Sequence, residues 1–492
     1  MKQNLKIGIT LLIGLFLFYF TNGQHYFALA AWIYPIFILQ VSRKGNRLLN
    51  YLIIPILLGL AVGFSLWDER SVHGNIVSYL PGMFGVLLGY VYALDYFLYS
   101  RIKGFSATLT LPIIYTVFEF SIDLFNPLGS GGTLPYSQLN FLPFAQLASV
   151  TGRTGMTFII TWFGSIVYWV YNNQQNFTSI KKGVSVYGFI LMSILLFGGL
   201  RLTFDNIDST VKVSGIHTTD RSTSREFYKA FRGDDLTTAR KISNHSFEEL
   251  IAATKQEASS GSKFILWSEV AYGLLKEDEY KNITTLKQIS DSLDIYLLVN
   301  PIIPNKNGRW ENKLMAFSPD GQLLFEHYKF GGNFIEGTVK GDQKLRTVET
   351  PFGNIAGIIC WDADFPSIIR QVASKDVDIL FISAADWIGI TPTHGDQAIF
   401  RAIENGCSIV RETLDGISFI ADNKGRLMNR VNHFQTKEWV MTGYVPNKRE
   451  KTIYSVIGDL FGWLTIVGLF ILIILSIKQR KNITSNTTTN IV

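Results

Sequence analysis

Long apolar runs alternate with short polar stretches through the first 203 residues of the chain. Each run has roughly 16 to 22 residues, about the length that a helix needs to cross a bilayer. The pattern predicts a transmembrane domain at 1–203 with seven spans, and an eighth span that follows a long polar block. The predicted spans are 5–20, 27–41, 51–67, 78–99, 105–122, 155–171, 184–203 and 458–477.

Basic residues between the runs predict the orientation of the chain, because short loops rich in Lys and Arg stay in the cytoplasm. The connections on one side are basic, whereas those on the other side contain only Arg70 and Arg153. Both termini are therefore predicted in the cytoplasm, with a tail at 478–492, and the polar block 204–457 is predicted outside it. The basic positions are Lys2, Lys6, Arg43, Lys44, Arg47, Arg101, Lys103, Lys181, Lys182, Lys478, Arg480 and Lys481.

The connection at 123–154 is long, contains Gly and Pro, and is nearly uncharged. One interpretation is a plain connector between two spans. The other is a segment packed at the membrane surface or partly re-entrant, where irregular backbone must be covered by protein or water. The sequence leaves both interpretations open.

The polar block 204–457 contains short β-type runs that alternate with helical patterns. Its length is sufficient for one α/β domain with a full core. Alternation of this kind predicts a sheet with helices on its faces. The predicted strands are 211–216, 263–268, 295–300, 314–318, 354–360, 378–384, 407–413 and 417–425, and the predicted helices are 236–259, 278–293, 366–375 and 396–406.

Composition narrows the class of protein. Charged residues make up only 17% of the chain and the mean hydropathy is +0.20, which is too apolar for an ordinary soluble or a disordered protein. The net charge of +6 does not indicate nucleic acid, because the basic excess lies in short loops between apolar runs. Two cysteines cannot form a disulfide scaffold, and no Cys/His cluster has the spacing of zinc ligands. We expect an integral membrane protein with no nucleic-acid partner, no metal and no other cofactor.

Three reactive side chains stand at the ends of apolar runs in the polar block. Glu269 follows one run, Cys360 ends another, and Lys329 follows an apolar segment between them. A thiol can attack a carbonyl to form a thioester, a carboxylate can move the proton, and a lysine can stabilise the oxyanion. The three residue types form a sufficient set for acyl transfer, although each taken singly is more often structural.

The order and surroundings of these residues resemble the nitrilase (carbon–nitrogen hydrolase) superfamily, which uses a Glu–Lys–Cys triad on a four-layer αββα sandwich. Residues 267–269 (WSE) look like its W-P-E motif with Ser in place of Pro, and 328–329 (YK) look like its lysine segment. Residues 358–366 (IICWDADFP) look like its nucleophile segment, and the three motifs occur in order. The resemblance implies that the catalytic residues are Glu269, Lys329 and Cys360, spaced by 60 and 31 positions.

Seven predicted spans before such a domain and one after it resemble the apolipoprotein N-acyltransferase family in particular. That resemblance implies transfer of a fatty acyl group from a phospholipid, through a Cys thioester, to the amine of a diacylglyceryl-cysteine lipoprotein. It also implies ping-pong kinetics, membrane lipids as surroundings, and a place in the bacterial cytoplasmic (inner) membrane with the catalytic domain on the periplasmic side. Nothing in the sequence demands more than a monomer. Further family-like positions are Glu119, Gly129, Tyr136, Gln138, Gly152, Gly155, Gln397, Arg401, Glu404, Gly416, Ser418, Asp422 and Gly425.

Four more residues accompany the triad in family-like segments. Glu336 looks like an accessory glutamate and Asp362 like the acidic residue after the nucleophile, so we expect both to support the triad. We expect Trp361 and Trp387 to contact substrate, with core packing as the alternative for each. The chain departs from the family pattern at 215–217, 330–336 and 384–386, which bears on the substrate rather than on the triad.

The remaining candidates are expected to be structural. His217, His327 and His394 are interpreted as surface or hydrogen-bonded residues, because the triad needs no imidazole. Cys407 is interpreted as a buried free thiol, since a disulfide to Cys360 would block the mechanism.

Two other classes of function compete with the acyltransferase. A membrane-anchored amidase or nitrilase could hydrolyse a small amide or nitrile, but an enzyme with a soluble substrate needs an anchor rather than eight spans. A catalytically silent scaffold could bind lipidated proteins, but it would have little reason to keep three reactive groups.

Overall fold

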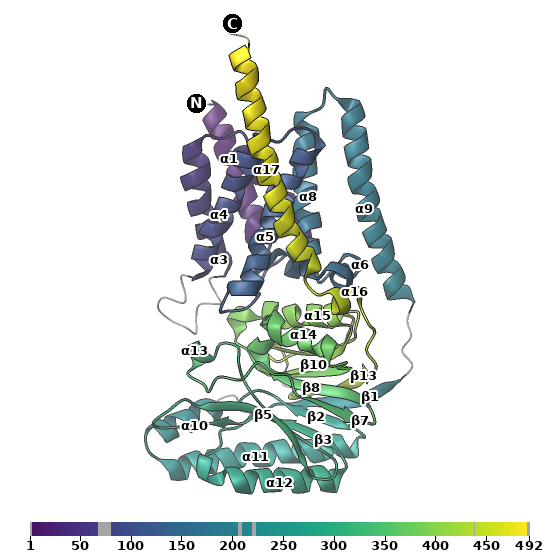
Figure 1. Ribbon diagram of the computed structural model, residues 1–492. Helices are drawn as coiled ribbons and strands as arrows, with labels where there is room; N and C mark the ends of the chain where they lie inside the picture. Colours follow the sequence, from purple (N-terminus) through teal and green to yellow (C-terminus); the bar gives the residue numbers. More distant parts are fainter. Residues whose placement is uncertain (1, 67–79, 205–208, 219–222, 437, 490–492) are drawn as a thin grey trace. The chain divides into compact units, whose positions relative to one another are not determined.

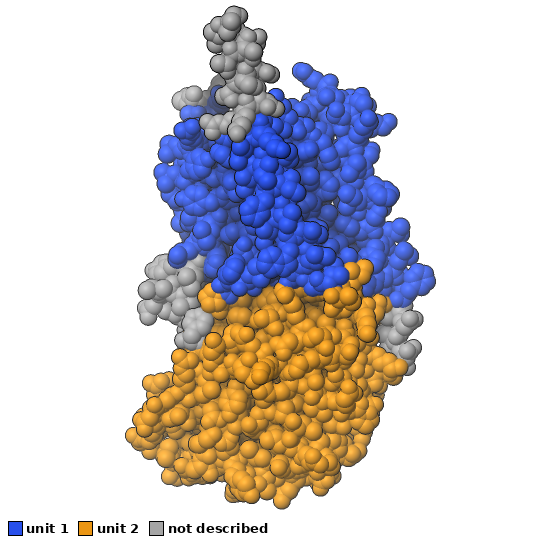
Figure 2. Space-filling model, viewed as in Figure 1, with its two compact units in different colours: residues 1–126, 132–204, 457–492 blue, residues 127–131, 205–456 orange. Residues whose placement is uncertain are grey.

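The computed structural model describes residues 2–66, 80–204, 209–218, 223–436 and 438–489, so the predicted loop at 68–77 lies outside the described residues. The chain forms two compact units, coloured separately in Figure 2. Residues 1–126, 132–204 and 457–492 form the helical unit. Residues 127–131 and 205–456 form the sandwich unit, so five residues of the connection between two predicted spans belong to it by their contacts.

Helices occupy all eight positions at which the sequence predicts membrane spans (Figure 1). They are α1 (Lys2–Tyr19), α2 (Ala28–Ser42), α3 (Ile54–Ser65, preceded by a π-helical turn at Leu49–Ile53), α4 (Leu80–Tyr99), α5 (Thr110–Phe125, preceded by a 3-10 turn at Phe105–Leu109), α8 (Arg153–Asn172), α9 (Phe177–Thr203) and α17 (Leu460–Thr489). Within the described residues, four helical stretches are long and apolar enough to cross a membrane: Pro81–Tyr99, Phe105–Phe125, Phe177–Thr203 and Leu460–Gln479. The chain is therefore a membrane protein.

The connection at 123–154 is packed rather than open. Its chain forms three short helical turns, at Leu134–Gln138 (η5), Leu142–Ala145 (α6) and Ala148–Thr151 (α7). The buried carboxylate of Glu119 accepts hydrogen bonds from the backbone N–H of Leu134, at 2.7 Å, and from the hydroxyl of Thr157. Arg153 donates to Asp123 at 2.9 Å. Pairing of these polar groups inside the protein favours the interpretation of a packed segment over that of a plain connector.

The sandwich unit contains two mixed sheets. The seven-stranded sheet has the order β13-β1-β2-β3-β5-β4, with β6 paired to β5, and the six-stranded sheet has the order β12-β11-β10-β9-β8-β7. The first sheet comprises β1 (Thr210–Ile216), β2 (Phe264–Trp267), β3 (Tyr296–Val299), β4 (Ile302–Ile303), β5 (Glu311–Phe317), β6 (Leu323–Tyr328) and β13 (Val440–Pro446). The second comprises β7 (Thr347–Thr350), β8 (Gly353–Ile359), β9 (Ile379–Ala385), β10 (Ser408–Leu414), β11 (Ile417–Ala421) and β12 (Leu427–Asn432).

Helices cover the outer face of each sheet, which makes four layers (Figure 1). Alternate residues of the strands explain the layering, because successive side chains of a strand point to opposite faces. Phe264 and Leu266 of β2 join Phe381 of β9 in the core between the sheets, whereas Ile265 and Trp267 face the helices. The covering helices are α11 (Leu236–Ser259) and α12 (Glu279–Leu293) on the first sheet, and α14 (Pro366–Ser374) and α15 (Thr393–Asn405) on the second.

The helix and strand pattern predicted for the polar block is largely confirmed. All four predicted helices are present, although α15 begins three residues before the predicted start at 396. The β4, β6, β7, β12 and β13 strands were not predicted, because each is short, polar on one face, or paired only with a distant part of the chain. β13, for example, pairs with β1 from the other end of the unit.

Parallel pairing of strands brings the candidate catalytic residues to one edge of the sandwich unit. The β1, β2 and β3 strands run parallel in one sheet, and β8, β9 and β10 run parallel in the other. The backbone N–H of Glu269, just after β2, donates to the carbonyl of Ala384 in β9 at 3.1 Å. The carboxyl ends of the two parallel sets therefore meet at the same edge, where residues that follow a strand can act together.

Candidate active site

The structure brings the three predicted catalytic residues together at this edge. The Lys329 ammonium donates to Oε1 of Glu269 at 2.8 Å and to Oε1 of Glu336 at 2.7 Å. Lys329 and Glu269 are both 2% exposed, and Cys360 is 6% exposed. Although burial by itself lowers the pKa of Lys329, the charges of Glu269, Glu336 and Cys360 hold that pKa well above its usual range. Lys329 therefore carries a full positive charge between two carboxylates.

Cys360 lies on a sharp turn at the end of β8. Its φ of +47° falls in the left-handed region, which is unfavourable for a residue with a side chain and is common at functional sites. The Sγ atom lies 3.8 Å from the carbonyl oxygen of Ala385. Burial and the neighbouring Glu269 raise the pKa of the thiol well above its usual range, and Lys329 opposes that rise. The nucleophile therefore needs a base beside it to become a thiolate.

Glu269 has one carboxylate oxygen bound and one without a described partner. Its Oε1 accepts from Lys329 and, at 2.6 Å, from Nδ2 of Asn312, whose Oδ1 accepts from Asn300 at 3.0 Å. Its buried Oε2 accepts no hydrogen bond from any described residue. The next residue, Val270, has a φ of +53°, a strained value for a β-branched side chain. This arrangement leaves Oε2 available to take a proton.

Asp362 ties the nucleophile turn to the lysine segment. Its Oδ1 accepts from the backbone N–H groups of Phe330 (2.9 Å) and Gly331 (2.7 Å). Its Oδ2 accepts from the N–H of Ile359 (3.1 Å) and lies 2.7 Å from Nε2 of His327. Asp362 is fully buried, so these bonds position the backbone that follows Lys329 against the turn that holds the thiol.

The two tryptophans occupy different surroundings. The indole N–H of Trp361 donates to the carbonyl of Leu128 at 2.9 Å, which attaches the segment 127–131 to the sandwich unit. Gly332 lies against the ring of Trp361, where an added Cβ would come within 2.2 Å of the ring. Trp387 is half-buried and follows β9 by two residues. Their predicted contact with substrate stays a prediction.

A cavity of about 450 Å³ opens beside the triad. Among the described residues its wall includes Glu269, Lys329, Glu336 and Ala385, together with Trp310. Cys360 does not line the cavity. Its Sγ contacts the carbonyl oxygen of Ala385, and Ala385 does line the cavity. A substrate carbonyl in this cavity would therefore approach the thiol past Ala385.

Sequence reasoning missed several polar residues of this edge. Asn312 donates a hydrogen bond to Glu269, but in the sequence it is an asparagine in an ordinary strand pattern with no motif around it. His394, predicted to be structural, lies beside Asp386, Arg411 and Cys360. The sequence could not find these residues, because each comes from a separate element. Cys407 is a buried free thiol, as predicted.

Among the residues that the structure describes, two groups of side chains place possible metal-ligand atoms within 4.8 Å of one another. In the first, His217 and His433 are already joined by a hydrogen bond of 2.9 Å, with Glu412 as the third member. In the second, Arg411 binds Asp386 beside Cys360 and His394, and a guanidinium there opposes the entry of a cation.

Comparison with known proteins agrees with this geometry. The profile of the carbon–nitrogen hydrolase family matches residues 243–452, which lie within the sandwich unit and contain all three triad positions. Most of the sandwich unit is therefore similar to proteins of the carbon–nitrogen hydrolase family. An amidase of known structure from Nesterenkonia sp. covers 48% of the chain and 91% of its own length, at 15% identity and a TM-score of 0.38.

Several relatives that match both the sandwich unit and part of the helical unit are named apolipoprotein N-acyltransferase. The protein of that name from Geobacter metallireducens is 22% identical over 77% of this chain and 76% of its own length. The one from Borreliella burgdorferi is 22% identical over 86% of this chain and 89% of its own length. The similarity therefore extends beyond the hydrolase unit into the apolar helices.

Proposed function

We propose that this chain transfers a fatty acyl group from a phospholipid, through a thioester on Cys360, to the amine of a diacylglyceryl-cysteine at the N terminus of a lipoprotein. The observation that carries the proposal is the buried cluster in which Lys329 bridges two glutamates beside a strained cysteine, in a chain similar along most of its length to proteins named apolipoprotein N-acyltransferase. Both the site chemistry and the apolar helices suit two lipid substrates.

The first half-reaction forms the thioester. The Cys360 thiol gives its proton to the free oxygen of Glu269 as Sγ attacks the ester carbonyl of the phospholipid. The ammonium of Lys329 stabilises the oxyanion of the tetrahedral intermediate. Collapse of that intermediate breaks the ester bond, and Glu269 returns the proton to the departing lysophospholipid oxygen.

The second half-reaction releases the acyl group. The neutral amine of the lipoprotein attacks the thioester carbonyl, and Glu269 takes a proton from the attacking nitrogen. Lys329 again stabilises the oxyanion. The C–S bond breaks, the amide forms, and the proton held by Glu269 returns to the sulfur of Cys360. Enzyme and thiol are regenerated, so the kinetics are ping-pong.

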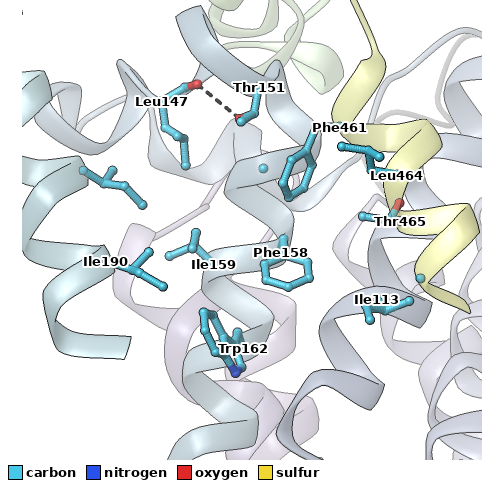
Figure 3. Close-up of a pocket in the computed structure, with 13 residues that line it drawn as sticks. Ile113, Leu147, Thr151, Phe158, Ile159, Trp162, Ile190, Phe461, Leu464 and Thr465 are labelled. Atoms are coloured by element: carbon cyan, nitrogen blue, oxygen red, sulfur yellow. Dashed lines mark hydrogen bonds between the residues drawn. The ribbon is translucent and has the colours of Figure 1, made fainter. Parts of the chain in front are cut away.

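The helical unit supports a lipid substrate. Figure 3 shows a pocket of about 410 Å³ among α5, α8, α9 and α17, whose walls carry apolar side chains such as Phe158, Ile159, Trp162 and Leu464. Apolar walls of this kind suit a hydrocarbon chain. We infer eight spans in all, with both termini in the cytoplasm and the hydrolase unit on the outer side of a bacterial cytoplasmic membrane, where both lipid substrates are displayed. A monomer suffices for this chemistry.

The test is an acyl adduct on the nucleophile. Purified protein in detergent is incubated with phospholipid and its intact mass is measured, followed by addition of a diacylglyceryl-cysteine peptide. We expect an acyl adduct that maps to Cys360 and is discharged onto the peptide amine. Cys360→Ala should give no adduct, and Cys407→Ala is the matched control that should still give one.

Two results would contradict the proposal. An adduct that is discharged only to water indicates a lipid hydrolase. Absence of any adduct, together with hydrolysis of small amides by the same preparation, indicates an amidase of the kind that the carbon–nitrogen hydrolase family includes.

A further inference from the structure

A partly buried histidine, His394, lies close to Cys360 in addition to the proposed base Glu269. His394 lies in the first turn of α15, and Asp386 follows β9 directly. One ring nitrogen of His394, one carboxylate oxygen of Asp386 and Sγ of Cys360 all lie within 4.8 Å of one another. The thiol therefore faces a histidine–aspartate pair in addition to Glu269 and Lys329.

The histidine is held in place by charged neighbours. Its Nδ1 lies 2.9 Å from Oδ1 of Asp386, and its Nε2 lies 3.6 Å from Oδ2 of Asp364. Arg411 on β10 donates from one nitrogen to both oxygens of Asp386 at 2.8 Å, and also donates to the carbonyl of Ile417 at 3.0 Å. Asp386 and Arg411 are 2% and 1% exposed in their side chains. Asp386 and Arg411 are therefore fixed beside His394, and a guanidinium nitrogen of Arg411 lies 3.4 Å from its Nδ1.

The charged groups around His394 do not balance when His394 is neutral. The carboxylates of Asp386 and Asp364 supply two negative charges, and Arg411 supplies one positive charge. A neutral His394 would leave a net negative group against the position of the thiolate, which would oppose ionisation of Cys360. A protonated His394 balances the four groups. The two acidic neighbours raise the pKa of His394 above its usual value against the effect of burial, which lowers it.

Lys329 is not the sole source of positive charge for the thiolate of Cys360. Its ammonium already donates to the carboxylates of Glu269 and Glu336, so its positive charge is shared with two other acceptors. A second cation is therefore needed for a stable thiolate in a buried place.

We propose that His394 is protonated at neutral pH and that its positive charge, held by Asp386 and Asp364, stabilises the thiolate of Cys360. His394 is thus a positioning residue for the nucleophile, which adds a Cys–His–Asp arrangement to the Glu–Lys–Cys triad. The proposal rests on Cys360 being the nucleophile of the proposed function.

The experiment measures the reactivity of the thiol without any acyl substrate. Full-length wild-type protein and His394→Gln are alkylated with iodoacetamide from pH 6 to pH 11, a range that extends above the usual pKa of a thiol, and peptide mass separates Cys360 from Cys407. Gln keeps a hydrogen bond to Asp386 but carries no charge. We expect the midpoint of the Cys360 pH profile to rise by about one pH unit in the variant, with alkylation at pH 7 slower by about tenfold.

The matched control is His245→Gln, because the side chain of His245 is 66% exposed on α11. Its profile should equal that of the wild type. A variant that only destabilises the fold changes the alkylation rate of Cys360 at every pH and leaves the midpoint of its pH profile unchanged. An unshifted midpoint in His394→Gln therefore overturns the proposal.

A measurement on the wild type covers the case in which the variant does not fold. Hydrogen–deuterium exchange at the imidazole C2 position, followed by mass spectrometry of the His394 peptide, reports the pKa of that histidine in the intact protein. We expect His394 to be mostly protonated at pH 7, and a histidine that is mostly neutral at that pH overturns the proposal. Loss of the acyl adduct with an intact alkylation shift would instead refute the proposed acyl transfer and leave the His394 proposal standing.

Discussion

Replacing Lys329 by Met tests the central contact of the site. The methionine side chain fills nearly the same volume, but it removes the cation that lies 2.8 Å from Glu269 and 2.7 Å from Glu336. Two carboxylates that share one partner then face each other without it. Breaking a buried ion pair by removing one partner costs about 3–5 kcal/mol, so we expect the free energy of unfolding at pH 7.5 to fall by about 3 kcal/mol.

The pH dependence of this loss has a definite sign. In the wild type the raised pKa of Lys329 means that its contribution to stability is complete below the unfolded value of about 10.4 and is lost only above it. In the variant a falling pH relieves the repulsion between the two carboxylates once Glu336 takes up a proton, because burial already raises the pKa of Glu336 above its usual value. The difference in stability between the two proteins should therefore be largest at pH 7.5 and smaller at pH 5.

The assay is thermal unfolding of the detergent-solubilised protein, read from tryptophan fluorescence at pH 7.5 and pH 5. A loss of about 3 kcal/mol corresponds to a fall in Tm of about 6–12 °C for a unit of this size. Lys313→Met is the matched control, because Lys313 is also buried among glutamates (Glu279, Glu311 and Glu326) but lies away from the thiol. It should lose stability and keep acyl transfer, whereas Lys329→Met should lose both. A Lys329→Met protein with an unchanged Tm, or with a deficit that is equal at both pH values, refutes the reasoning.

Three further predictions concern the surroundings of the nucleophile. Asp362→Asn should slow acyl transfer by about tenfold or more and cost about 1–3 kcal/mol, because the amide keeps one acceptor oxygen and its NH2 group cannot accept the bonds made to the other carboxylate oxygen. The kcat and the Tm measure the two effects, and an unchanged kcat would remove Asp362 from the site. Gly332→Ala should destabilise the protein more than Gly337→Ala, since both glycines have a φ of +71° but only the first would bring a Cβ against the ring of Trp361; equal Tm values for the two variants would contradict the packing. Burial raises the pKa of Cys407 to about 12, so this thiol should resist alkylation at pH 8 until the protein is denatured, and modification of the native protein at Cys407 would show that it is not buried.

Much of the fold follows from local pattern. Long apolar runs predicted the eight membrane-spanning helices, and short β-type runs predicted most strands of the sandwich unit, because each pattern is visible within one element. Glu269, Lys329 and Cys360 could also be identified from the sequence, since each stands at the end of an apolar run in a recognisable motif. The sequence determined these features because each depends on neighbours along the chain.

The tertiary structure decided which side chains act on the triad. Asn312 reaches Glu269 from β5, and His394 reaches Cys360 from α15, across elements that no local pattern connects. The residues at 127–131 join the hydrolase unit from a connection between helices, where Leu128 accepts from Trp361. Hydrogen bonds and charge pairs depend on distances in space, and those distances are set only when the sheets and helices pack together.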